Sequence, residues 1–506
     1  MLKRFLKFMT HKVTIIAFLA LLQLTIFVLV VMLLNENFKY FLYFSNALSF
    51  IMVIFILKSD QPTVYKVSWV IPIIITPIFG GLFYLFFKPI TTTRKTTKRV
   101  NQINEFRKSQ MLPLIHEARS VKTPYDKQIK NIQSEVYPHY ENTEITFLES
   151  GSVKLKQVMN ELKKAQKFIF LEYFILEETG QVWKTMYPIL LEKVKEGLDV
   201  RLIYDDFGSS VRINKGFRKR MEKVGIKTVT FNPMKLRLNV SLNYRDHKKI
   251  IVIDGDVGFT GGINIADEYA NIKKRFGHWH DAAIMLKGDA VFSLTASFIE
   301  AWDLHRKTST LLEPFAPTRL SKPDGVVVPF TDSPLDKTYL TKNVYTQMIY
   351  SANKDIYITT PYFIIDEDML NALKIQALGG VKIHIIVPGI PDKKMVFIVT
   401  KYYLKQLVSF PNVFIYSYEP GFVHSKMMLI DNEVATVGTC NFDFRSFYLH
   451  YENTVWFYKS NALKDVKNFM DYTISKSKLL DYRALNKTNI FFKVYESILV
   501  AVSHLL

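Results

Sequence analysis

Long apolar runs dominate the start of this chain and are absent from most of the rest. Three of them, residues 13–34, 40–57 and 67–87, fill much of the first 87 positions, and each approaches the ~20 residues that cross a bilayer as a helix. A cleaved signal peptide is the alternative for the first run, because the basic segment "MLKRFLKFMTHK" precedes it, but no small-residue cleavage site follows. The pattern therefore predicts hydrophobic membrane segments within residues 1–87.

Basic residues lie on both sides of this membrane part. They precede the first run and follow the third, and lysine and arginine favour the cytoplasmic side. Three complete crossings cannot place both ends there. Either one segment does not cross, the third being interrupted by Pro72, Pro77 and Gly80-Gly81, or the remaining chain lies outside. The sequence leaves the topology open.

The segment 88–136 is basic and shows little apolar periodicity, which is typical of a juxtamembrane linker. A basic residue near an anionic membrane surface contributes about 1 kcal/mol of attraction. A solvated charged helix is an equally good interpretation of the same composition.

From residue 137 onward, helical and strand patterns alternate, which is typical of an α/β fold. The pattern also repeats. The stretch "VMNELKKAQKFIFLEYFIL" resembles "VYTQMIYSANKDIYITTPYFII". Residues 246–264, "DHKKIIVIDGDVGFTGGIN", match residues 424–441, "HSKMMLIDNEVATVGTCN", in the spacing of His, Lys, Asp, Gly and Asn. These matches predict two homologous halves, 137–320 and 321–506, packed about a pseudo-twofold axis that brings the two motifs face to face.

The C-terminal stretch "NIFFKVYESILVAVSHLL" carries apolar residues at helical spacing. One hypothesis is an amphipathic helix that lies in the membrane interface. The other is a helix that packs on the second domain.

The composition restricts the kinds of partner and chemistry that the protein can have. The net charge of +20 implies an anionic partner, either nucleic acid or acidic lipid. The single cysteine, Cys440, excludes an internal disulfide and a multi-cysteine zinc site, and its apolar surroundings favour a packing role. No phosphate-binding loop ending in Lys-Ser or Lys-Thr occurs, so ATP-driven chemistry has no evident site.

The repeated motif supplies the candidate chemistry. His247 and Lys249 stand two positions apart on a strand and so share a face, as do His424 and Lys426. Two imidazoles and two ammonium groups that face each other form a cationic pocket, which favours an anion such as a phosphodiester. Lysine is a poor metal ligand and its charge opposes a cation, so we predict no metal and no cofactor.

Histidine can itself act on such an anion. A neutral imidazole can attack phosphorus, and a second, protonated imidazole can give its proton to the departing alcohol. The two motif lysines and the amides of Asn264 and Asn441 would then bind the equatorial oxygens of the phosphate. The other predicted phosphate-binding positions, each two residues before one of these asparagines, are Gly262 and Thr439.

The two stretches resemble the paired HKD motifs of the phospholipase D superfamily. The apolar N-terminal segments, "GGINIADEY" after the first motif and "FDFRSF" after the second make the chain similar to bacterial cardiolipin synthases in particular. The resemblance runs from about the second hydrophobic segment to the C-terminus. It implies an α/β fold of two pseudo-twofold-related phospholipase D-like domains, each a mixed sheet flanked by helices. It also implies a multi-pass protein of the bacterial cell membrane.

The chemistry that the resemblance implies is phosphatidyl transfer without ATP. His247 attacks one phosphatidylglycerol to form a phosphatidyl-histidine, and glycerol leaves with a proton from His424. The 3-hydroxyl of a second phosphatidylglycerol then attacks, which gives cardiolipin. Phosphatidylglycerol is thus both donor and acceptor in a setting of anionic membrane lipids. Neither nucleic acid nor an obligatory protein partner is expected.

Four acidic residues complete the predicted site. Asp254 and Asp431 are the third members of the motifs and are counted with the catalytic residues. Each stands seven positions after its histidine, an odd spacing that puts it on the opposite strand face, where it would fix the turn and the strand register. The resemblance implies that an acid at the start of a later strand orients each histidine. The matching positions are Asp281 and Glu452.

Residues outside the motifs have two interpretations each. His278 and His280 could face one side of a strand as metal ligands, or they could pack at a sheet edge. The pair Asp205-Asp206 ends a strand where sites often lie in α/β folds, or it caps a turn.

Other functions remain open on sequence grounds. A phospholipase D that hydrolyses lipids or exchanges head groups would use the same residues with a different acceptor. A nuclease of the same superfamily would use the basic charge on DNA, although three hydrophobic segments argue against it. A non-catalytic lipid-binding scaffold would tolerate loss of a motif residue, and both motifs are complete.

Overall fold

The computed structural model describes most of the chain. The described residues are 38–59, 63–87, 94–117, 121–233, 244–319, 321–336, 338–486 and 490–503, with six isolated positions between residues 21 and 29. They form two compact units, of which the first comprises residues up to Thr91 and the second begins at Thr92.

In its described part, the first unit contains the apolar helices α3 (Phe38–Leu57), α4 (Thr63–Ile75) and α5 (Pro77–Phe87). One helix among the described residues, Lys39–Leu57, is long and apolar enough to cross a membrane. The expected segment 67–87 is not one continuous helix. It is divided before Pro77, because proline lacks the backbone N–H that an uninterrupted helix needs. The expected segment 13–34 lies, apart from the isolated positions, outside the described residues.

The basic stretch after the membrane part, expected as a juxtamembrane linker or a solvated charged helix, is helical over most of its described residues and partly buried. It forms α6 (Arg94–Glu117) and α7 (Asp126–Ser134), both within the second unit. Along α6, Val100, Ile103 and Met111 recur at helical spacing and are buried. The guanidinium of Arg107 is also buried, 3.1 Å from the carboxylate of Glu300. A narrow apolar stripe is therefore sufficient to dock a strongly basic helix.

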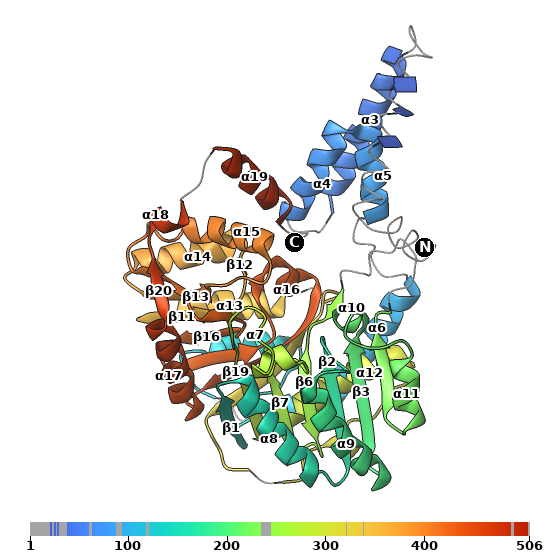
Figure 1. Ribbon diagram of the computed structural model, residues 1–506, viewed down its shortest axis with the longest axis vertical. Coiled ribbons are helices and arrows are strands. Elements are labelled where there is room, and N and C mark those ends of the chain that lie inside the picture. The colour runs from blue at the N-terminus through green and yellow to red at the C-terminus, as the bar shows by residue number, and fades with distance from the viewer. Residues whose placement is uncertain are drawn as a thin grey trace. The chain divides into compact units, whose positions relative to one another are not determined.

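Two large mixed sheets in the second unit have the same strand order. Figure 1 labels β2, β3, β6 and β7 of the first sheet and β11, β13, β16 and β19 of the second. The first half has the order β1-β9-β7-β6-β2-β3-β4, and the second half has the order β10-β19-β17-β16-β11-β13-β14, extended by β20. The strands correspond one to one along these two lists. The repeat found in the sequence is thus a repeat of topology, with β6 and β16 carrying the two motifs at the middle of their sheets.

The elements of the first half follow the expected alternation. Its helices are α8 (Gly151–Lys164), α9 (Gln181–Lys195), α10 (Asp206–Ser209), α11 (Phe217–Lys223) and α12 (Val291–Arg306), with short 3-10 turns at Asp267–Ala270 and Glu313–Phe315. Its strands are β1 (Thr143–Leu148), β2 (Phe168–Tyr173), β3 (Asp199–Asp205), β4 (Lys227–Phe231), β5 (Arg245–Asp246), β6 (Lys249–Ile253), β7 (Val257–Gly261), β8 (His278–His280) and β9 (Ala283–Gly288).

The second half has a matching set and a C-terminal extension. Its helices are α13 (Leu340–Ser351), α14 (Glu367–Leu378), α15 (Lys394–Lys405), α16 (Phe444–Tyr448), α17 (Ala462–Ser475), α18 (Tyr482–Leu485) and α19 (Ile490–Ala501). Its strands are β10 (Val326–Asp332), β11 (Asp355–Thr359), β12 (Phe363–Ile364), β13 (Lys382–Pro388), β14 (Val413–Tyr418), β15 (Gly421–Val423), β16 (Met427–Ile430), β17 (Val434–Gly438), β18 (Phe442–Asp443), β19 (His450–Tyr458) and β20 (Ser477–Leu480).

The central strands are buried on both faces, as their continuous apolar runs require. Successive side chains on a strand point to opposite faces. On β2, Phe168 and Phe170 join a core that also contains Phe457 of the second sheet. The alternate residues Ile169 and Leu171 join a separate core with residues of α8 and α9. The two halves therefore share one central core and behave as a single compact unit.

Two short strands cross from one half to the other. Strand β5 pairs in parallel with β19, and β8 pairs in parallel with β15. Each pairing ties the segment just before one motif to the opposite half of the unit. This exchange positions the candidate site.

Candidate active site

Both motif histidines lie just before their strands and are anchored to the opposite half. The backbone N–H of His247 donates to the carbonyl of Tyr451 at 2.9 Å, and that of His424 donates to the carbonyl of His280 at 2.7 Å. These bonds continue the β5–β19 and β15–β8 pairings. Residues that are far apart in the sequence are thereby brought into one buried site.

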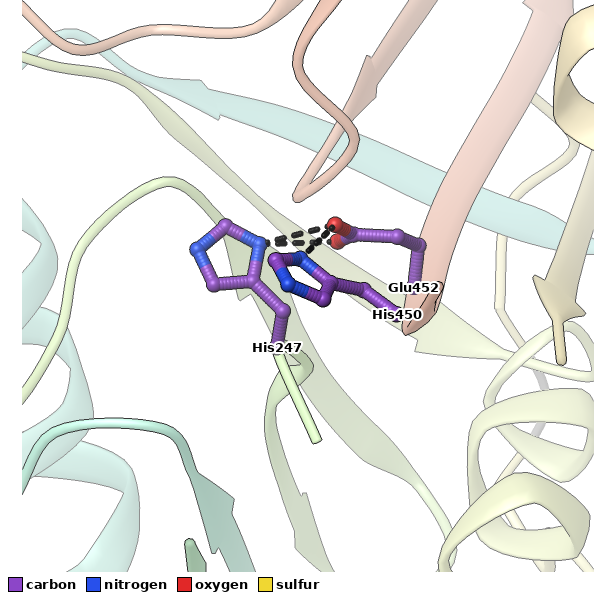
Figure 2. Close-up of side chains that lie close together, drawn as sticks. All are labelled: His247, His450 and Glu452. Carbon is purple, nitrogen blue, oxygen red and sulfur yellow. Dashed lines mark hydrogen bonds and ion pairs between the residues drawn. The ribbon is translucent and has the colours of Figure 1, made fainter. Parts of the chain in front are cut away.

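A carboxylate holds each imidazole. The Nδ1 atom of His247 lies 2.9 Å from both carboxylate oxygens of Glu452 (Figure 2), and the Nδ1 atom of His424 lies 2.6 Å from Oδ2 of Asp281. Both acids are fully buried. The pairing is crossed, because the acid that follows the first motif contacts the histidine of the second motif, and the reverse. With Nδ1–H donated to a carboxylate, Nε2 is the nitrogen left for chemistry.

A third histidine, which the sequence interpretation missed, lies beside this pair. Figure 2 shows His450 next to His247 and Glu452, with its Nδ1 atom 3.5 Å from Oε1 of the same carboxylate. The centroids of the two imidazole rings are 5.4 Å apart. His450 stands two residues before Glu452 on β19, so the strand period of two placed both on one face and could have revealed it.

The two halves differ in the residue that stands two positions before the orienting acid. Trp279 stands two residues before Asp281, as His450 does before Glu452, and its ring centroid is 5.2 Å from that of His424. One catalytic imidazole therefore has a tryptophan beside it and the other has a histidine.

The two motif lysines are buried behind the histidines. Each ammonium group donates to the main-chain carbonyl of the histidine two residues earlier, at 2.5 Å for Lys249, and Lys426 makes the equivalent bond to His424. Burial lowers the pKa of Lys249 to about 7 and that of Lys426 to about 8, although the nearby acids oppose the shift. Each ammonium retains N–H groups that can bind an anion.

The protein surroundings favour neutral imidazoles at both motif positions. Burial is the main cause that lowers the pKa of His247 well below its usual range, followed by the charges of Lys249 and Lys426. Burial and Lys426 lower the pKa of His424 to about 4, although Asp281 opposes this effect. A bound phosphodiester would offset the lysine charges and raise both histidine pKa values toward neutrality.

The predicted phosphate-binding residues divide into two kinds. The Oδ1 atom of Asn264 accepts from the backbone N–H of Ile175, and the amide of Asn441 donates to Asp443 at 2.9 Å. Both asparagines are thus oriented by protein groups and have part of their hydrogen-bonding capacity left.

The other two predicted phosphate-binding positions contact the carboxylates that hold the histidines, and their role in phosphate binding stays a prediction. The Thr439 hydroxyl donates to Oε2 of Glu452 at 2.5 Å. A Cβ atom at Gly262 would lie 2.0 Å from Oδ1 of Asp281, so only glycine leaves room for that acid. Both residues therefore support the acids that hold the histidines.

The third motif residues do not contact the histidines. The carboxylate of Asp254 accepts hydrogen bonds from the backbone N–H groups of residues 166, 167 and 168 at 2.7 to 3.0 Å. Asp431 holds residues 353, 354 and 355 in the same way, at 2.8 to 2.9 Å. Counting these two acids with the catalytic residues is therefore not supported by their contacts. Each fixes the start of the strand that neighbours its motif strand.

Residues outside the motifs have packing or bracing contacts. The ring of His280 stacks on Tyr418 and Phe469, and its Nε2 atom lies 2.7 Å from the hydroxyl of Thr473. Asp205 caps α10 and also accepts from the backbone N–H of Asp246, 3.2 Å away, which braces the segment before His247.

One group of side chains among the described residues could hold a metal ion. Nitrogen and oxygen atoms of His247, His450 and Glu452 lie within 4.8 Å of one another. Two imidazoles and a carboxylate are a known donor set for zinc. The ammonium groups of Lys249 and Lys426 oppose a cation here, so the prediction of a metal-independent reaction stays in place.

Comparison with known proteins gives a consistent result. Residues 158–299 and 345–474 match the family described as cardiolipin synthase, PLD-like domain, and residues 47–89 match the family described as phospholipase D-nuclease N-terminal. The chain is 33% identical to a cardiolipin synthase of Halalkalibacterium halodurans over 90% of this chain and 92% of that protein. It is 34% identical to one of a Geobacillus species over 91% and 93%.

A similar bacterial protein and a solved structure add to this. The chain is 36% identical to a protein of Streptococcus mutans over 90% of this chain and 99% of that one. The crystal structure of phosphatidylserine synthase from Haemophilus influenzae covers 76% of this chain and 98% of its own, with a TM-score of 0.59 and 15% identity. That likeness shows the fold.

Proposed function

Because the chain belongs to the cardiolipin synthase family with PLD-like domains, we propose that it condenses two phosphatidylglycerol molecules into cardiolipin and glycerol through a phosphatidyl-histidine intermediate. Membership of the family makes the protein a phosphatidyltransferase that acts on phospholipids and associates with membranes. The observation that carries the finer proposal is the meeting of two carboxylate-held histidines, one from each motif, near two buried lysines.

In the first step, Nε2 of His247 attacks the phosphorus of one phosphatidylglycerol. A P–N bond forms, the P–O bond to the head-group glycerol breaks, and Nε2 of His424 gives its proton to the departing alkoxide. Lys249 and Lys426 stabilise the negative charge that develops on the equatorial oxygens. The bound anion offsets the burial and the lysine charge that lower the pKa of His424, so that His424 can enter this step protonated.

In the second step, His424 acts as a base instead of an acid. Neutral His424 removes a proton from the 3-hydroxyl of another phosphatidylglycerol, and the resulting oxygen nucleophile attacks phosphorus. A P–O bond forms, the P–N bond to His247 breaks, and cardiolipin leaves. One phosphodiester replaces another, so the exchange needs no external energy source.

The orienting acids fit these unequal roles. Asp281 contacts His424 at 2.6 Å, a short distance that favours the imidazolium this residue must carry as an acid. Glu452 accepts from both His247 and Thr439, so its negative charge is shared between two donors, and Nδ1 of His450 lies 3.5 Å away. That arrangement supports His247 as the histidine that is neutral when it attacks.

Lipid products test the proposal directly. Purified full-length protein in vesicles of phosphatidylglycerol should form cardiolipin and an equal amount of glycerol, measured by mass spectrometry. Phosphatidic acid as the main product would instead indicate a hydrolase with the same residues. No turnover of phosphatidylglycerol would refute both activities.

Variants test the two-histidine mechanism. His247→Ala and His424→Ala should each abolish transfer, whereas His278→Ala, an exposed histidine outside the site, should retain it. A phosphatidyl group radiolabelled at phosphorus and bound to wild-type protein should be released by acid and retained in alkali, as expected for a phosphoramidate. Such an adduct in His247→Ala at the wild-type level would refute the assignment of the nucleophile.

We also propose that the N-terminal unit anchors the protein by more than one crossing, with residues 137–320 and 321–506 as two domains of one catalytic body. Support comes from the apolar helices that follow α3, where Trp69 and Ile73 of α4 pack with Ile56 in a small core. Labelling of single cysteines before α3 and after α5 with a membrane-impermeant reagent would place each end. Ends that lie on opposite sides would indicate an odd number of crossings.

A further inference from the structure

We propose that the outer face of α19, together with the exposed segment that leads into α15, is a membrane-docking surface that holds the mouth of the active site against an anionic lipid bilayer. The proposal goes beyond the reaction itself. It rests only on the phospholipid substrate class and not on the identity of the product.

The outer face of α19 is apolar and open to solvent. Phe491, Val494, Tyr495 and Ile498 are 82%, 56%, 41% and 57% exposed. They follow the spacing i, i+3, i+4, i+7, which places them on one side of a helix. Large apolar side chains gathered in this way on a helix surface mark a contact with a partner or a membrane.

The opposite side of α19 is fixed to the protein. Leu499 is 3% exposed and Glu496 is 8% exposed. The ammonium of Lys405 at the end of α15 donates to both carboxylate oxygens of Glu496, at 2.7 and 2.9 Å. The two hypotheses for the C-terminal stretch are therefore compatible, because one side of the helix packs on α15 and the other is left for a second contact. Figure 1 shows α19 in dark red and α15 in orange within the second half.

The same surface extends toward the catalytic residues. At the start of α15 and just before it, Ile390 and Met395 are 42% and 46% exposed, and they flank the exposed bases Lys393 and Lys394. Lys393 is close enough to His247 for its charge to lower the pKa of that imidazole. Helix α15 thus has Lys393, which acts on His247, at its start and Lys405, which binds α19, at its end.

The chemistry of this surface fits a lipid head-group layer. Apolar side chains are interspersed with exposed lysines, including Lys493 on α19 itself. Such a surface can insert its apolar groups at the level of the glycerol backbones while the ammonium groups pair with lipid phosphates. A bilayer that contains phosphatidylglycerol supplies both features, and it also supplies the substrate. Docking here would present head groups to the pocket without the lipid leaving the membrane.

Site-specific labels on the full-length protein test the location. Single cysteines would be placed at Phe491 and Ile498 on the outer face and at Ser497, which is exposed on a different side of the helix, as the matched control. The native Cys440 is fully buried, so it should not react. Each variant would carry a nitroxide label and be reconstituted into vesicles of phosphatidylglycerol and phosphatidylcholine.

The expected result is a contrast between the two sides. Labels at 491 and 498 should collide more with oxygen dissolved in the bilayer than with a water-soluble nickel chelate, and the label at 497 should show the reverse. Equal water access at all three positions would refute the docking surface. Strong dipolar coupling between labels on two copies, without oxygen access, would also refute it and indicate a dimer contact.

Kinetics test the consequence for catalysis. The double variant Phe491→Ser and Ile498→Ser should raise the KM for phosphatidylglycerol in vesicles about tenfold, because burial of apolar side chains in the interface is lost. Its kcat/KM for a short-chain, monomeric phosphatidylglycerol should equal that of the wild type, which also serves as the control for folding. Equal losses on both substrates would refute a role in docking. If wild-type protein gave no cardiolipin from either substrate, the proposed product would fail, and the label measurements would still decide the docking surface.

Discussion

The crossed contacts between acids and histidines predict that Asp281 acts on the protonation of the leaving group through His424. The perturbation is Asp281→Asn, which preserves the shape of the side chain and removes its charge. The carboxylate is fully buried and lies 2.6 Å from Nδ1 of His424. The matched variant is Glu452→Gln, which removes the charge that holds His247.

The magnitude follows from the charge pair. Two unit charges whose centres are about 4 Å apart interact by about 4 kcal/mol at an effective dielectric constant near 20. If the imidazolium loses most of that stabilisation, the rate of a step that needs its proton falls by roughly 10²- to 10³-fold. Asp281→Asn should therefore lower kcat by about that factor for phosphatidylglycerol, whose glycerol leaves as a poor leaving group and must receive a proton.

The assay compares two leaving groups. Phosphatidyl-p-nitrophenol releases an acidic phenol that can depart without a proton, and the release is followed by absorbance. Asp281→Asn should be close to the wild type in the release of p-nitrophenol, while its first-step rate with phosphatidylglycerol stays low. Glu452→Gln should be impaired with both substrates, because attack by His247 is common to them. An equal defect of Asp281→Asn on both substrates would refute the assignment of His424 as the acid. If Glu452→Gln alone released p-nitrophenol at the wild-type rate, the roles of the two histidines would be reversed.

Three further predictions follow from individual contacts. Asp254→Ala removes an acceptor for three backbone N–H groups and should lower the free energy of unfolding by about 2–4 kcal/mol, measured by denaturant titration. The kcat of the folded variant should stay near the wild-type value. A loss of kcat without a loss of stability would instead place Asp254 among the catalytic residues. The pKa values of about 7 for Lys249 and about 8 for Lys426 mean that the free enzyme loses positive charge at the site as pH rises, so kcat/KM should fall above about pH 7–8. The value of kcat depends on the enzyme–substrate complex, in which the anion holds the protons on the lysines, so it should fall only at higher pH. If Lys426→Arg retains activity, the pH at which its kcat/KM falls should be higher than in the wild type. An unchanged pH would show that another group causes the fall. Dialysis against EDTA should leave the phosphatidyl transfer activity unchanged. If EDTA abolished the activity, and Zn²⁺ restored it in the wild type but not in His450→Asn, a metal would instead lie among His247, His450 and Glu452.

Much of the architecture could be predicted from the sequence because the repeat is local and periodic. The order of strands around β6 is the order around β16, as the matched blocks required, and the resemblance to the phospholipase D superfamily is confirmed by the family match. The odd spacing from histidine to aspartate correctly placed Asp254 away from the imidazole, since it depends only on the period of one strand. The segment 94–117 was harder, because four buried positions in a basic helix give a weak pattern.

The sequence by itself determined the two halves and the reactive residue types, and its resemblance to the superfamily indicated which acids contact the histidines. Tertiary structure alone decided which acid meets which histidine, that Thr439 and Gly262 contact the acids, and which of the rings of His450 and Trp279 lies beside which imidazole. The reason is physical. Contacts along one strand follow from its period of two residues, so the spacing of residues in the sequence predicts them. Contacts between Asp281 and His424, or between His247 and Glu452, depend on how β8 pairs with β15 and β5 with β19, and those pairings are set by the packing of two whole sheets.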